Sequence, residues 1–149
     1  MFDHCSSLTS VDLSGFSTSH VQSMFNMFYG CSSLKSLDLH SFNTRSLEAT
    51  SGMFNGCTSL TTLDLSSFQT GKLETIHTMF KNCSNLKTIY VGKDWNPSKV
   101  SNGTDVFLNC NKLVGGKGTT YSETRVNYPY AIVDGGTTNP GYFTYKGIQ

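Results

Sequence analysis

Three aspartates recur at a fixed spacing in the first half of the chain. Asp12, Asp38 and Asp64 follow one another at intervals of 26 residues. Tyr90 takes the aspartate position in the next repeat, and His40 occupies the neighbouring outward position of the second repeat. A row of carboxylates can accept hydrogen bonds from sugar hydroxyls or pair with basic side chains of a protein partner. We hypothesise that these five residues form a binding face. The alternative is that water and nearby Ser and Thr hydroxyls simply solvate the row.

A metal is not expected at this row, and no cofactor is predicted. Calcium needs six to eight oxygen ligands, which one column of Asp and Ser supplies poorly. The chain has five cysteines, an odd number that argues against a closed disulfide framework. Zinc sites use paired Cys or Cys/His spacings, which this sequence lacks. The cysteines instead recur at one position of a repeat, which predicts a buried column of free thiols: Cys5, Cys31, Cys57, Cys83 and Cys110.

The sequence also contains no combination of residues that is typical of a catalytic site. The four histidines fall at four different positions of the repeat, and neither a G-x-S-x-G nor an H-E-x-x-H motif is present. The segment GGKGTT at 115–120 lacks the GK[ST] ending of a phosphate loop, so we interpret it as turns. We therefore predict a protein that is not an enzyme. The competing prediction is an enzyme whose site lies near the C-terminus, where Tyr121, Asp134 and Tyr142 could gather.

The elements that would position these residues are set by the repeat itself. The motif MFxxC begins at Met1, Met27, Met53 and Met79, and a weaker copy begins at Val106. A period in the range of 20 to 50 residues is typical of solenoids. An L-x-x-L-x-L pattern follows each of the first four copies, and its last positions alternate in polarity as a strand with one buried face does. These strand segments are 8–13, 34–39, 60–65 and 86–91.

The fold class predicted from this pattern is an α/β leucine-rich repeat solenoid with parallel strands. Apolar residues at spacings of three and four, such as Val21, Met24 and Phe28, predict short helical turns on the convex side. We assign residues 1–112 to the repeats and 113–149 to a small β-rich C-terminal cap. Within the cap, 130–133 and 142–145 are predicted to form a hairpin that covers the open edge of the last repeat.

The opposite edge has no polar cap in this sequence. Solenoids need one at each end to stay soluble. We therefore expect further repeats upstream of this chain in a longer protein. As an isolated chain, it is expected to associate edge to edge through the first repeat, most simply as a two-fold dimer.

The repeat MFxxC[ST]SLxxLDLSSFxT, together with the glycine-rich tail at 113–144, resembles the BspA-like family of bacterial leucine-rich repeat surface proteins. The resemblance implies a secreted or cell-surface protein used in adhesion or host contact, with a host or matrix protein or a glycan as partner. It carries over no catalytic residues. The given sequence contains no signal peptide, so an extracellular location is inferred from the resemblance alone.

The amino-acid composition also limits the classes of partner that we expect. The net charge is +1 and only 14% of the residues are charged, so nucleic acid is not an expected partner. No apolar run is long enough to predict insertion into a membrane. A purely structural spacer that displays another domain remains the alternative to a binding module.

Overall fold

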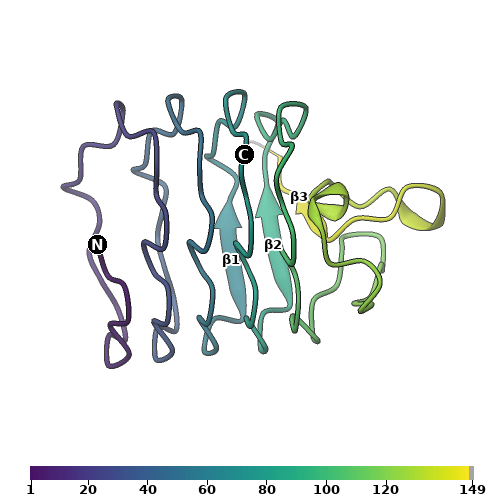
Figure 1. The fold of residues 1–149 in the computed structure, drawn as a ribbon, viewed down its shortest axis with the longest axis horizontal. Helices are drawn as coiled ribbons and strands as arrows, with labels where there is room; N and C mark the ends of the chain where they lie inside the picture. The colour runs from purple at the N-terminus through teal and green to yellow at the C-terminus, as the bar shows by residue number, and fades with distance from the viewer. Residues whose placement is uncertain (148–149) are drawn as a thin grey trace.

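The computed structural model describes residues 1–147 and contains few regular elements. Three short strands, β1 (Thr62–Leu65), β2 (Thr88–Val91) and β3 (Phe143–Tyr145), form one parallel sheet in the order β1-β2-β3. Two 3₁₀ turns, η1 (Tyr128–Tyr130) and η2 (Gly136–Thr138), precede β3. Most of the remaining chain runs in successive coils that lie side by side, from the N-terminus at one end to the cap at the other (Figure 1).

Backbone bridges show that each coil corresponds to one sequence repeat. Parallel bridges join Ser23 to Ala49, Ala49 to Thr75, and Thr75 to Asn102. On the other side of the coil, β1 and β2 pair in parallel with Thr62 opposite Thr88. Equivalent positions of neighbouring repeats therefore lie next to one another, so a residue type that recurs in the sequence forms a column in space.

The helical turns predicted for the return segments are not present, and the described residues contain no α-helix. The reason lies in the backbone hydrogen bonds. Met24, Asn26, Phe28 and Gly30 donate their N–H groups to carbonyls of the next repeat. Since every second N–H is used between coils, the i to i−4 bonds of an α-helix cannot form. The N–H groups between them close tight turns within the coil, as Met27 does to the Met24 carbonyl at 3.2 Å.

This alternation repeatedly places residues in the left-handed backbone region. Two positions of the repeat have positive φ throughout the stack, and asparagine, glycine and aspartate, the residues that best tolerate this conformation, fill most of them. The first column comprises Asn26, Gly52, Thr78 and Asp105, and the second comprises His4, Gly30, Gly56, Asn82 and Asn109. The β-branched Thr78, with φ of 54°, is the least suited residue among them.

Two of the four predicted strand segments are regular strands in the structure. Segments 60–65 and 86–91 contain β1 and β2, whereas 8–13 and 34–39 follow the same path in Figure 1 without regular strand pairing. A single backbone hydrogen bond, from Lys35 N–H to the Thr9 carbonyl at 3.3 Å, joins those two segments. The sheet therefore becomes regular only toward the cap.

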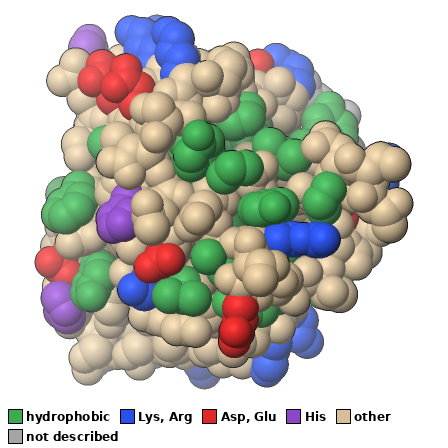
Figure 2. All heavy atoms as spheres, turned by 45° about the vertical axis from the view of Figure 1, so that its right-hand side comes forward, with side chains coloured by type: hydrophobic (Ala, Val, Ile, Leu, Met, Phe, Trp, Pro, Cys, Tyr) green, Lys and Arg blue, Asp and Glu red, His purple; other side chains and the backbone are tan. Residues whose placement is uncertain are grey.

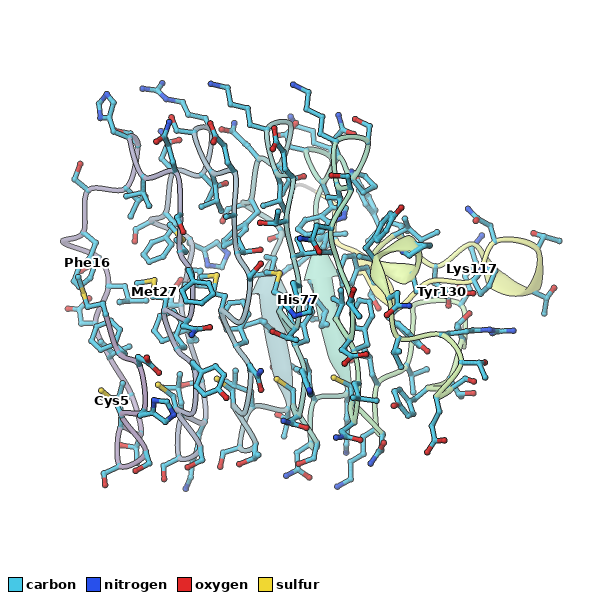
Figure 3. The ribbon with its side chains drawn as sticks, viewed as in Figure 1. Cys5, Phe16, Met27, His77, Lys117 and Tyr130 are labelled. Carbon is cyan, nitrogen blue, oxygen red and sulfur yellow. The ribbon has the colours of Figure 1, made fainter. Side chains whose placement is uncertain are left out.

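The core consists of columns that run through the coils. Phe28 and Phe54 stack with ring centroids 5.9 Å apart and planes within 3° of parallel, and Phe80 continues the stack at 5.8 Å. The predicted column of cysteines lies beside them (Figure 3). Four of the five thiols are buried, and all five are free: Cys5 is partly exposed, and Cys31, Cys57, Cys83 and Cys110 are buried.

Each buried thiol joins its coil to the preceding one. The Sγ of Cys57 donates to the Phe28 carbonyl at 3.2 Å, and that of Cys110 donates to the Phe80 carbonyl at 2.9 Å. Burial raises the pKa of both thiols to about 12. The nucleophilic thiolate is therefore scarce at neutral pH, and these cysteines are structural.

This column predicts a simple pattern of thiol reactivity. In the native protein a maleimide should label Cys5 rapidly, because it is the partly exposed member of the five. The four buried thiols should react only after the chain unfolds. Mass spectrometry of the labelled protein checks this, with Cys5→Ser as the control that should take up no rapid label. Rapid labelling at two or more positions would contradict the assignment.

A buried threonine ladder, defined here as Thr18, Thr44 and Thr70, supplies the polar link between coils. The hydroxyl of Thr44 accepts the Gln69 N–H at 2.8 Å and donates to the Gln69 carbonyl at 3.2 Å. Thr18 makes the same pair of bonds to Asn43. These threonines were not singled out from the sequence, so the ladder is a feature that sequence reasoning missed.

We expect Thr44→Val to destabilise the protein by about 2 kcal/mol although it keeps the side-chain volume. The valine would leave the Gln69 N–H, whose bond to Thr44 is partly buried, without its acceptor. Thr44→Ser retains the hydroxyl and loses one methyl group, which costs about 0.8 kcal/mol. Urea unfolding of both variants provides the measurement. The ladder would have no energetic role if the valine variant were as stable as the serine variant.

The cap closes the sheet in a different way from the predicted hairpin. β3 pairs with β2 in parallel, and Val133 also forms a parallel bridge with Phe143, so the hairpin prediction is wrong. The segment between them makes a crossover through η2 instead of a tight turn. The predicted covering of the sheet edge is nevertheless present, since β3 occupies the free side of β2. Trp95 fixes this arrangement by donating its indole N–H to the Ala131 carbonyl at 3.0 Å.

The first coil leaves apolar side chains partly uncovered. Phe2, Val11 and Phe16 are only partly buried, and Met1 and Phe25 are 80% and 63% exposed. Edge-to-edge association through this coil stays a prediction, for which light scattering on the purified chain is the measurement. We expect a mass that rises above the monomer with concentration. A monodisperse monomer at high concentration would contradict it.

Candidate functional site

The three aspartates of the row share one local geometry. Each carboxylate accepts the backbone N–H two residues further along, from Ser14 at 3.0 Å, His40 at 3.0 Å and Ser66 at 2.9 Å. Such a bond is the usual way in which Asp closes a turn at the end of an extended segment. Each aspartate therefore has a structural role and still presents further oxygen lone pairs to solvent.

The second and third aspartates lie in a cluster of charged and aromatic side chains. The Nδ1 of His40 is 2.8 Å from the Asp38 carboxylate, and its Nε2 is 3.8 Å from that of Asp64. Lys146 Nζ approaches Asp64 to 2.6 Å and lies 5.4 Å from the centre of the Tyr90 ring. Asp64 and Tyr90 are also partners in the pairing of β1 with β2.

The structure thus brings together four of the five predicted residues and adds one that the sequence did not indicate. Lys146 is 82 residues from Asp64 in the chain, so no local pattern could connect them. Asp12 lies at the N-terminal end of the row, and its carboxylate bonds to the hydroxyl of Ser14 at 2.6 Å. We call Asp12, Asp38, His40, Asp64, Tyr90 and Lys146 the strand-face row.

Hydrogen bonds keep the three aspartates of the row ionised at neutral pH. The hydrogen bonds from Ser14 lower the pKa of Asp12, and those from His40 lower the pKa of Asp38. Burial alone would raise the pKa of Asp64, but hydrogen bonds from Lys146 and Ser66 outweigh it and the pKa is lowered. The same bond to Asp64 raises the pKa of Lys146. The row therefore carries fixed charges of both signs.

A shallow hollow of about 410 Å³ adjoins this cluster. Its lining is polar: His40, Ser66, Ser67, Gly92, Lys93, Asp94, Lys146 and Gly147. Lys93 and Asp94 form their own ion pair at 3.1 Å. The hollow therefore offers hydroxyl, carboxylate and ammonium groups to a polar ligand.

The three cap residues considered as an enzymatic alternative each have a structural partner. The Tyr121 hydroxyl accepts the Asn109 N–H at 3.0 Å, and the Tyr142 hydroxyl accepts the Ser122 N–H at 3.2 Å. Tyr142 is fully buried against Phe107, with ring centroids 4.8 Å apart. Asp134 is buried beneath two loops that donate hydrogen bonds to it. The three do not face a common hollow.

Two further features bear on the kind of site. Among residues 1–147, no three His, Cys, Asp or Glu side chains are grouped so as to hold a metal ion. No helix in this same part of the chain has the length and apolar character needed to cross a membrane.

Comparison with known proteins identifies the repeats. Residues 1–117 match the family described as Mycoplasma protein of unknown function, DUF285. The chain belongs to this family. The match covers every coil of the DUF285 repeats and ends just inside the cap, before Asp134 and β3. No curated protein and no solved structure matched the chain.

Proposed function

We propose that this DUF285 protein is a non-catalytic binding module of a secreted or cell-surface protein, with the strand-face row as its contact surface. The observation that carries the proposal is the cluster of Asp38, His40, Asp64 and Lys146 beside a polar hollow. These side chains lie outside the apolar core. They hold charges of both signs at fixed positions, which suits recognition of a polar surface.

The proposed ligand is a glycan or a polar segment of a host or matrix protein. Carboxylates accept hydrogen bonds from sugar hydroxyls, and the ring of Tyr90 provides a flat surface against which a sugar can pack. We also propose that the coils form a leucine-rich repeat solenoid of the BspA-like kind. The L-x-x-L-x-L spacing, the parallel pairing of β1 with β2 and the resemblance of the repeats support it. An extracellular location and a role in adhesion follow from the same resemblance.

The proposal is tested by binding to arrays of matrix proteins and glycans. The variant Asp12→Asn with Asp38→Asn removes two charges but keeps an oxygen that can accept the turn N–H. A matched control, Glu48→Gln with Glu74→Gln, removes two charges from exposed positions of the return segments. We expect the first variant to lose at least tenfold in affinity and the control to bind as the unmodified protein does. Equal binding by both variants would overturn the assignment of the site.

A structural spacer is the second candidate. The observation that favours it is that each aspartate of the row already closes a turn, which alone explains its place in the repeat. A spacer should bind nothing on the same arrays, so the experiment above separates the two candidates.

A further inference from the structure

A second hollow lies in the cap, away from the strand-face row. It measures about 260 Å³ and is lined by residues from two loops and the segment between them. Its lining residues are Lys117, Gly118, Thr119, Thr120, Arg125, Gly136, Thr137 and Pro140. We call it the cap hollow. It contains two cationic side chains and three threonines, and it shares no lining residue with the hollow on the strand face.

The two cations of the cap hollow have no acidic partner. Within residues 1–147, neither Lys117 nor Arg125 forms an ion pair, and neither side chain donates a hydrogen bond. Both are exposed. The charged groups on the face shown in Figure 2 are scattered, with positive and negative side chains interspersed. Lys117 and Arg125 therefore line the cap hollow without a carboxylate that neutralises either charge within residues 1–147.

The walls of the cap hollow are held in place by the buried carboxylate of Asp134. Its Oδ2 accepts the N–H groups of Lys117 and Thr119 at 2.9 and 3.0 Å. Its Oδ1 accepts the Thr119 hydroxyl at 2.7 Å and the Gly136 N–H at 2.9 Å. One carboxylate thus joins the loop at 115–120 to the start of η2. The backbone at Lys117 is therefore held in place before any ligand arrives, which lowers the entropic cost of ordering this wall of the hollow.

The close packing of this frame explains why position 115, the first of two consecutive glycines, is a glycine. A Cβ on Gly115 would lie 2.2 Å from the Gly141 carbonyl oxygen and 2.5 Å from an oxygen of Asp134. Only glycine therefore allows the loop to approach the carboxylate. The segment that resembles a phosphate loop in sequence is not followed by a helix here, so it is not a nucleotide-binding loop of that kind.

We propose that the cap hollow binds an anionic oxygen group, a phosphate or sulfate ester, through Lys117 and Arg125. Two cationic side chains, Lys117 and Arg125, line the hollow. The nearby negative charge of Asp134 is single, and its oxygens are already occupied by donors from the frame. Arginine and lysine are the residues that proteins use most for phosphate and sulfate, and the hydroxyls of Thr120 and Thr137 can donate further bonds. The volume is below the usual range for a drug-sized ligand, so it suits one anionic group of a larger molecule.

The test is an NMR titration of the full chain with inorganic phosphate and, separately, with inorganic sulfate. We expect saturable shifts of the backbone amides of Gly118, Thr119, Thr120 and Gly136. Lys117→Gln and Arg125→Gln should each weaken binding about tenfold, because a hydrogen bond to a charged group contributes about that much. The matched control, Lys72→Gln with Lys99→Gln, removes two exposed charges elsewhere and should bind unchanged.

Two ester probes then distinguish the sources of the anion. Tighter binding of a phosphorylated monosaccharide than of its sulfated counterpart assigns the site to phosphate esters, and the reverse order assigns it to sulfate esters. Failure of both inorganic ions to saturate the shifts overturns the proposal, as does equal weakening by the control variant. All these variants are at exposed positions, so thermal unfolding should confirm that each one folds as the original does.

Discussion

Replacing Asp134 with alanine should lower the free energy of unfolding by at least about 3 kcal/mol. The substitution removes the acceptor for several partly buried backbone and hydroxyl donors of the cap, and each donor left unsatisfied costs about 1 to 3 kcal/mol. Urea unfolding of the full chain measures the loss. The control is Asp94→Ala, which removes an exposed aspartate paired with Lys93 and should cost less than about 1 kcal/mol. Similar losses for the two variants would contradict the structural role of Asp134.

The same carboxylate should make the protein sensitive to acid. The hydrogen bonds to Asp134 outweigh the opposing effect of burial and lower its pKa from 3.8 to about 2. A group whose pKa is depressed in the folded state stabilises the protein above its unfolded pKa, and that contribution is lost as the pH falls through the folded pKa. The stabilisation, about 2.5 kcal/mol, should therefore be complete above about pH 4 and disappear toward pH 2.

The acid sensitivity can be assigned to this residue by comparison. Asp134→Asn has no titrating group at this position, so its stability should fall less between pH 4 and pH 2 than that of the unmodified protein. Urea unfolding at several pH values provides the curves. Parallel curves for the two proteins would show that the acid sensitivity arises elsewhere, for example at the strand-face row.

The second large effect on stability is expected in the column of stacked rings that contains Phe28, Phe54 and Phe80. Phe54 is fully buried and stacks between Phe28 and Phe80 in the middle of the coils. Phe54→Ala should cost about 3 to 5 kcal/mol, because it removes a buried ring and leaves a cavity that fixed coils on both sides cannot fill. Thermal or urea unfolding of the full chain is the measurement.

A matched pair of controls tests whether stacking in the column, and not phenylalanine content, is responsible. Phe25 is 63% exposed, and Phe25→Ala should change stability by less than about 0.5 kcal/mol. Phe2 ends the column and is only partly buried, so Phe2→Ala should fall between the two. Any other order of the three variants would contradict this view of the core.

The columns were predictable from sequence, whereas the backbone path between them was not. A period of 26 residues places Cys31 beside Cys57, so identity at one position implies contact in space. The spacing of Val21, Met24 and Phe28 resembles that of a helix. In the structure, this segment instead donates alternate backbone N–H groups to the carbonyls of the next coil. The sequence of a single repeat does not reveal these bonds. The threonine ladder was missed because threonine after phenylalanine looks like ordinary polar surface.

The candidate site was predictable in part for the same reason. Asp38, His40 and Asp64 lie at related positions of neighbouring repeats, and the period alone brings them together. Lys146 reaches Asp64 only because β3 joins the sheet in parallel, and the sequence had indicated a hairpin there. The cap hollow depends on contacts of Asp134 with two loops, which follow no periodic pattern.

The bonding of each coil to its immediate neighbours has a consequence for the history of such genes. Thr18 bonds to Asn43 and Thr44 bonds to Gln69 in the same way, so an inner coil meets equivalent partners on either side. Unequal recombination between the DNA segments that encode two inner repeats would add or remove 26 codons and leave every junction of the same type. The coil that carries Trp95 lies outside this exchange, because its indole bond to the cap belongs to that one place in the protein. Selection can therefore lengthen or shorten the row of aspartates in whole steps while the end that carries Asp134 stays constant.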